Sequence, residues 1–137
     1  MQTENGLAHF FSDVPTRLED FDALDTAAKP LQRISARLTR TNAMKRALSG
    51  SWCAHRLHPM LTDVPIGCFT SASAIDLVAW RSGEGAARRL VGLGLIATVP
   101  TIASGLSDWE DTQGGTKRVG VVHAAANGVG ALLQVAS

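Results

Sequence analysis

The sequence lacks the short motifs that mark the common catalytic and metal sites. Its two cysteines, Cys53 and Cys68, form no CxxC pair and are too few for a disulfide framework. It has no HExxH, no cysteine–histidine zinc spacing and no GxSxG, which argues against zinc proteases, zinc modules and serine hydrolases. Its basic residues come without the aromatics of a nucleic-acid-binding sheet, so no nucleic-acid partner is expected.

Charge is distributed unevenly along the 137 residues. Residues 1–25 hold six acids and one base, whereas residues 26–59 hold seven bases and no acid. From Met60 onward, charge is nearly confined to two short loops. Because the first 25 residues lack the apolar stretch and cleavage site of a signal peptide, we expect the first membrane span to direct insertion.

This distribution predicts three segments: a polar acidic segment over 1–28, a basic amphipathic helix over 29–50, and a membrane domain over 51–137. In the basic segment, apolar residues recur at helical spacing and cations fill most of the remaining arc. Such a helix beside a span is typical of an interfacial helix on anionic lipid. The alternative is a solvated helix packed on a soluble core. Gly50 is expected to end it.

Three apolar stretches follow, near residues 60–80, 90–106 and 119–137. The first would be about 31 Å long, close to the hydrocarbon thickness of a bilayer. The second has no charge and no polar face, which a surface helix of a soluble bundle would need. Small residues at Gly120, Ala124 and Gly128 allow close helix approach in a membrane. We therefore predict an all-α transmembrane helical bundle with an N-terminal interfacial amphipathic helix.

Prolines punctuate the entry to the first span. Pro59 and Pro65 both lie where a helix would begin, and Thr62 could cap it. This pattern predicts a broken or re-entrant turn, with a regular helix from about Ile66. Irregular backbone at that depth must be buried in protein or face water.

Polar residues gather at one membrane face. Three consecutive spans bring together the start of the first, the end of the second and the start of the third. The polar residues that lie there are His55, His58, Asp63, Asp108, Trp109, His123 and Asn127. Asp76 lies about 20 Å beyond Asp63 along the helix, near the opposite face. An ion pair between Asp76 and Arg88 or Arg89 would explain the presence of Asp76 at that face.

The histidines carry the clearest chemical potential. Imidazoles from two facing helices can ligate a haem iron or another transition metal, so His58 and His123 are the candidate metal ligands. Asp63 or Asp108 could orient the second ring nitrogen of such a ligand. The other candidate cofactor-binding residues of the cluster are His55, Trp109 and Asn127.

Each of these residues also has a purely structural interpretation. His55 and His58 could lie among lipid headgroups, and Asp63 could cap a helix. Asp108 with Trp109 could form a helix end and an interfacial anchor. His123 is costly within a span, although a hydrogen bond between helices to an asparagine or an aspartate would account for it.

The bias of Lys and Arg predicts an orientation. Six of these residues lie near the first face: Arg40, Lys45, Arg46, Arg56, Lys117 and Arg118. Three lie near the second face: Arg81, Arg88 and Arg89. The bias favours a cytoplasmic N-terminus in the inner (plasma) membrane.

Several stretches resemble a known family. They are residues 55–67 (HRLHPMLTDVPIG), Asp76-Leu77, residues 105–109 (GLSDW), and residues 118–124 (RVGVVHA) with Asn127. Over about residues 45–137 the chain is similar to the bacterial membrane family catalogued as domain of unknown function 2231. Arg56 stands where relatives commonly have proline, which weakens a role for His55.

The resemblance implies a four-span domain, of which this chain matches the first three, so that a fourth helix would be missing, cut off or supplied by a partner. It also implies proximity to redox modules, namely Rieske-type iron–sulfur domains and c-type cytochromes. The chain has no Rieske cysteine–histidine pairs, so no iron–sulfur cluster is expected within it.

Three functions follow as hypotheses. The first is a membrane anchor or scaffold for a redox partner. The second is an electron-transfer domain that binds haem b or a quinone through His58 and His123. The third is a small ion-conducting or permease subunit with Asp63, Asp76 and His123 on a proton path, which would require oligomers.

Overall fold

Every element of regular secondary structure is helical in the part of the chain that the computed structural model describes, residues 13–136. Its labelled elements are α2 (Ala23–Leu38), α3 (Asn42–Ser49), the 3-10 turn η1 (Ser51–Cys53), α4 (Leu57–Glu110) and α5 (Gly114–Ala136). Residues 13–19 are also helical. The predicted all-α class is confirmed, while the first part of the predicted acidic segment and the last residue of the third predicted span lie outside the described residues.

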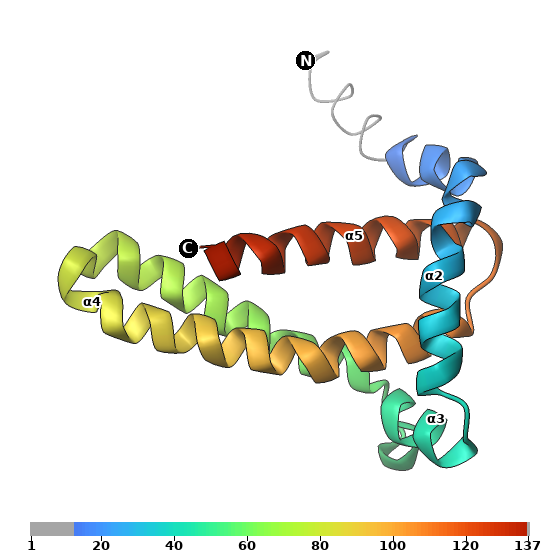
Figure 1. The fold of residues 1–137 in the computed structure, drawn as a ribbon, viewed down its shortest axis with the longest axis horizontal. Coiled ribbons are helices and arrows are strands. Elements are labelled where there is room, and N and C mark those ends of the chain that lie inside the picture. The colour runs from blue at the N-terminus through green and yellow to red at the C-terminus, as the bar shows by residue number, and fades with distance from the viewer. Residues whose placement is uncertain (1–12, 137) are drawn as a thin grey trace, which may run out of the picture.

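The long helix α4 doubles back on itself, so that its two halves run side by side (Figure 1). We call these halves the first limb (Leu57–Ala79) and the second limb (Arg81–Glu110); both limbs and α5 are long and apolar enough to cross a membrane. Gly83 permits the tight bend, since a β-carbon there would overlap the side chains of Ile75 and Ala79. The three predicted spans are confirmed, with longer helices than expected.

The predicted broken entry to the first span is wrong, because α4 is helical from Leu57 through both prolines. Pro59 falls in the first turn, where a backbone N–H has no helical partner. Pro65 is buried and removes one helical hydrogen bond. The carbonyl that it leaves unpaired, that of Leu61, accepts from the Thr101 hydroxyl of the second limb instead. The helix therefore continues past Pro65.

The single basic helix predicted over residues 29–50 is two helices, α2 and α3. The break falls at Thr41, whose backbone is extended and whose hydroxyl accepts a hydrogen bond from the Met44 N–H. This N-cap starts a new helix in place of continuing the old one. Gly50 ends α3 as predicted, with a left-handed φ of 77°.

Helix α2 crosses the end of the limbs and of α5 at a steep angle, and α3 projects beyond the side of the limbs (Figure 1). The inner side of α2 buries Ala28 against Trp109 and Val121. Three partly buried leucines surround this cluster: Leu24, Leu31 and Leu106. The hydrophobic core of the described residues thus lies at one end of the bundle, where the predicted polar residues also gather.

Candidate functional site

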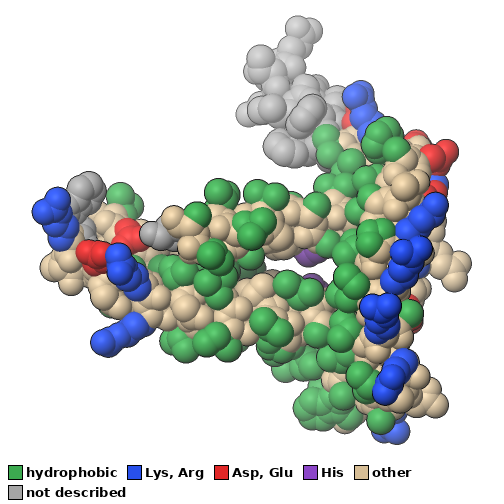
Figure 2. Space-filling view, in the orientation of Figure 1, with side chains coloured by type: hydrophobic (Ala, Val, Ile, Leu, Met, Phe, Trp, Pro, Cys, Tyr) green, Lys and Arg blue, Asp and Glu red, His purple; other side chains and the backbone are tan. Residues whose placement is uncertain are grey.

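Two histidines from different helices meet at this end of the bundle. His58 lies in the first turn of α4, and His123 lies on α5. Their ring centres are 6.4 Å apart, with an angle of 85° between the ring planes. Figure 2 shows histidine side chains facing a hollow between α5 and the rest of the molecule. The pair brings together the two histidines that the sequence predicts as metal ligands.

The His58 ring is held by the second limb. Its Nδ1 lies 3.0 Å from the carbonyl oxygen of Thr101. Because a carbonyl only accepts, Nδ1 carries the proton and Nε2 keeps its lone pair. Gly105 makes room for the ring, since a β-carbon there would lie 2.8 Å from its Cε1. The second limb therefore fixes both the tautomer and the position of the His58 imidazole.

His123 is exposed and paired within its own helix. The side-chain nitrogen of Asn127 lies 3.1 Å from its Nε2 and 2.8 Å from its carbonyl oxygen. The spacing of four residues places the two side chains on one face of α5, as the sequence predicts. Asn127 orients the imidazole and, as the donor, leaves the proton of a neutral His123 ring on Nδ1.

The spacing of the pair is compatible with a shared metal. A metal–imidazole bond is about 2 Å long and each ring centre lies about 1 Å behind its nitrogen, so two opposed imidazoles on one ion have ring centres roughly 6 Å apart. Among the described residues no group of three or more His, Cys, Asp or Glu could hold a metal ion. A group that takes only two protein ligands, such as haem, would suit this pair if the Asn127 N–H left the His123 Nε2 lone pair that it occupies here.

The other predicted site residues have separate surroundings. His55 is exposed, and its Nδ1 lies 3.1 Å from the carbonyl of Cys53. Asp108 forms an ion pair of 2.9 Å with Arg56. Trp109 is buried in the core and donates to the Lys117 carbonyl at 2.9 Å. These contacts provide each residue with a structural role at the same end of the bundle.

The two aspartates of the first limb, Asp63 and Asp76, are exposed. Within the described part of the chain, no hydrogen bond or ion pair joins either of them to His123. Of the two expected partners of Asp76, Arg88 pairs with Glu84 at 2.8 Å instead, and no ion pair between Asp76 and Arg89 is present among the described residues.

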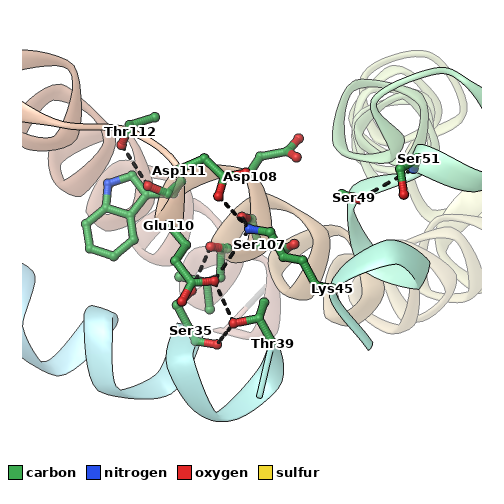
Figure 3. A network of polar contacts seen from close by, with 12 residues as sticks. Ser35, Thr39, Lys45, Ser49, Ser51, Ser107, Asp108, Glu110, Asp111 and Thr112 are labelled. Carbon is green, nitrogen blue, oxygen red and sulfur yellow. Dashed lines mark hydrogen bonds and ion pairs between the residues drawn. The ribbon is translucent and has the colours of Figure 1, made fainter. Parts of the chain in front are cut away.

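A polar network that sequence reasoning missed joins α2 and α3 to the end of α4 (Figure 3). Lys45 donates to the Ser107 carbonyl at 2.6 Å and to Asp111 at 2.9 Å. Glu110 accepts from the Thr39 hydroxyl at 2.5 Å and also pairs with Lys45 at 3.4 Å. Ordinary surface residue types form this network, so no local sequence signal distinguishes them.

A second clamp joins α2 to α5. Arg118 pairs with Asp25 at 2.9 Å and with Asp22 at 2.6 Å, and it donates to the Glu19 carbonyl at 2.7 Å. The hydrogen bond from Arg118 is the main cause that lowers the pKa of Asp25 below its ordinary value. Both clamps hold the N-terminal helices over the end at which His58 and His123 lie.

The fold is all-helical, with three helices long and apolar enough to span a membrane and a polar cluster at one end. Residues 54–137 match the family described as predicted membrane protein (DUF2231), and the chain belongs to this family. No curated protein and no solved structure gives a significant match. The resemblance drawn from the sequence motifs is thereby confirmed.

Proposed function

We propose that this chain is a membrane electron-transfer domain that holds haem b between His58 and His123. The observation that carries the proposal is the 6.4 Å separation of the two imidazoles, which come from different helices at one end of the bundle. Haem requires only two axial side chains and supplies one-electron chemistry once bound. Its presence would explain why histidines are tolerated at this depth.

The residues around the pair support this role. The Thr101 carbonyl accepts from His58 Nδ1, an arrangement typical of histidines that present the other nitrogen to a metal. Gly105 leaves the space that the ring needs. Asn127 holds the second ring through Nε2, so this hydrogen bond would have to break for that nitrogen to bind iron. Asp63 and Asp108 remain predictions as orienting groups, because no hydrogen bond or ion pair joins either of them to the histidines among the described residues.

An absorbance spectrum tests the proposal. The full chain, extracted in detergent from cells supplied with a haem precursor, should carry a Soret band that His58→Ala and His123→Ala each abolish. His55→Ala is the matched control and should retain the band, since its ring is exposed and contacts the Cys53 carbonyl. Colourless protein after haem supplementation, with helical content intact, would refute the haem assignment.

A membrane scaffold is the second candidate, supported by a different observation. Lys45 and Arg118 clamp α2 and α3 to the bundle, which leaves the outward face of these helices free for a partner. In that case the histidine substitutions would change stability or partner binding and leave no spectral trace. A redox partner at this face, inner-membrane localisation and a cytoplasmic N-terminus belong to the proposal as its expected setting.

A further inference from the structure

The apolar inner face of α2 is not available to lipid. Ala28 is 3% exposed, packed with Trp109 and Val121, and Ser35 is fully buried with its hydroxyl bonded to the Leu106 carbonyl at 2.9 Å. Arg33 and Arg37 lie on the opposite side of the helix from Ser35, and so face away from the spans. The lipid contact expected of a basic amphipathic helix must therefore come from another element.

The next segment, residues 40–53, has the free surface that α2 lacks; we call it the overhang. It projects beyond the side of the limbs (Figure 1) and leads within a few residues to Leu57, where the first limb begins. The overhang therefore lies at the level at which the first span enters the membrane. A helix in this position rests over lipid rather than over protein.

The overhang has an apolar and a basic side. Trp52 is 64% exposed and Met44 is 39% exposed, and the Trp52 indole N–H is already satisfied by the Ala47 carbonyl at 3.3 Å. Arg40 and Arg46 are exposed, and neither forms an ion pair with another described residue. In Figure 2 hydrophobic side chains gather on the side of this region nearer the limbs, and Lys and Arg side chains on its outer side.

Arg40 and Arg46 differ from the neighbouring cations, which form ion pairs within the protein. Lys45 of the same helix is used internally by Glu110 and Asp111, and Arg56 by Asp108. Arg40 and Arg46 thus provide positive charge that no ion pair within residues 13–136 neutralises, on a segment that also exposes a tryptophan. Tryptophan favours the headgroup level of a bilayer, and unpaired cations there attract anionic lipids.

We infer that the overhang is a docking surface for anionic phospholipid, with Trp52 and Met44 in the interface and Arg40 and Arg46 on the headgroups. The inference is independent of haem binding, because no hydrogen bond or ring contact joins the overhang to the histidine pair among the described residues.

Fluorescence quenching by brominated lipid tests the docking of the overhang on anionic phospholipid, using the full chain. The protein is reconstituted in phosphatidylcholine vesicles that contain an equal small fraction of either brominated phosphatidylglycerol or brominated phosphatidylcholine. The contribution of Trp52 is the difference between the wild type and Trp52→Phe. We expect phosphatidylglycerol to quench this contribution several-fold more effectively than phosphatidylcholine, and salt to weaken the preference.

Charge variants make the test specific. Arg40→Gln with Arg46→Gln should abolish the preference, whereas Arg40→Lys with Arg46→Lys should retain it. Arg81→Gln with Arg89→Gln, which removes the same charge from the exposed far end, should leave it unchanged. Helical content measured by circular dichroism checks that every variant is folded.

Two outcomes would overturn the inference. The first is equal quenching by both lipids, or a preference that survives the paired glutamine variant. The second is an absence of lipid preference together with salt-sensitive binding of soluble polyglutamate that the glutamine variant loses, which would assign the overhang to an acidic protein partner.

Discussion

The hydroxyl of Thr101 lies 3.2 Å from the carbonyl oxygen of Leu61, the carbonyl that Pro65 leaves without a helical donor. The same hydroxyl lies 2.8 Å from the Ala97 carbonyl of its own helix. The contact links the second limb to the first at a depth where unsatisfied backbone groups are costly. It therefore compensates for the proline and helps to fix the register of the two limbs.

Replacing Thr101 by valine should remove this link at nearly constant volume. We expect the free energy of unfolding to fall by about 1 kcal/mol, because the Leu61 carbonyl loses its donor. Thr98→Val is the matched control, since the Thr98 hydroxyl donates to the Gly94 carbonyl of its own helix at 2.8 Å and makes no cross-limb hydrogen bond within the described residues. Reversible unfolding in mixed detergent measures both. Equal losses in the two variants would show that the cross-limb bond contributes nothing.

The same contact explains which part of the fold the sequence could predict. Length and apolar composition predict three spans because each span needs only its own residues to meet the thickness of a bilayer. The continuity of α4 through Pro65 depends on Thr101, whose bond to Leu61 joins residues 40 positions apart. A local pattern around the proline contains no sign of that compensation, so a broken entry was the natural expectation.

The candidate site, too, could be predicted only in part from the sequence. The connectivity of three spans places His58 and His123 at one end, and helical spacing pairs His123 with Asn127. The clamp between Arg118 and Asp25 joins residues 93 positions apart, and neither residue belongs to a recognisable motif. The predicted polar face was therefore accessible from the sequence, whereas the contacts that attach α2 to it were not.

Glycine at position 120 admits the Trp109 indole, because a β-carbon there would overlap Cδ1 and Nε1 of that ring. Gly120→Ala should force the buried indole out of place and lower the stability by about 1–3 kcal/mol. Gly128→Ala on the same helix meets nothing within 4 Å and should be neutral or slightly stabilising. Thermal unfolding followed by circular dichroism compares the two. A harmless Gly120→Ala would contradict the tight packing of this core.

The clamp between Asp25 and Arg118 should depend on pH. The pKa of Asp25 is lowered in the folded chain, so its contribution to stability is fully present above the ordinary aspartate pKa of about 3.9 and is lost as the pH falls through the lower folded value. Asp25→Asn should weaken α2 docking at neutral pH and remove this part of the acid transition. Asp20→Asn, an exposed neighbour, is the control. Melting temperatures over an acid pH series measure the effect, and identical profiles for the wild type and Asp25→Asn would refute the assignment.

A substitution at Gly105 tests the proposed cofactor site without replacing either histidine. A β-carbon at position 105 would lie 2.8–3.3 Å from three atoms of the His58 ring, whereas one at Gly92, on the same limb, would meet nothing within 4 Å. Gly105→Ala should therefore displace the imidazole from the Thr101 carbonyl, and with it the Soret band expected of the haem-loaded chain should weaken or shift. Gly92→Ala should leave the spectrum unchanged. Because both substitutions add one methyl group to the same limb, a difference in absorbance at equal helical content reports on the His58 ring itself. An unaltered band in Gly105→Ala would mean that His58 does not bind the chromophore.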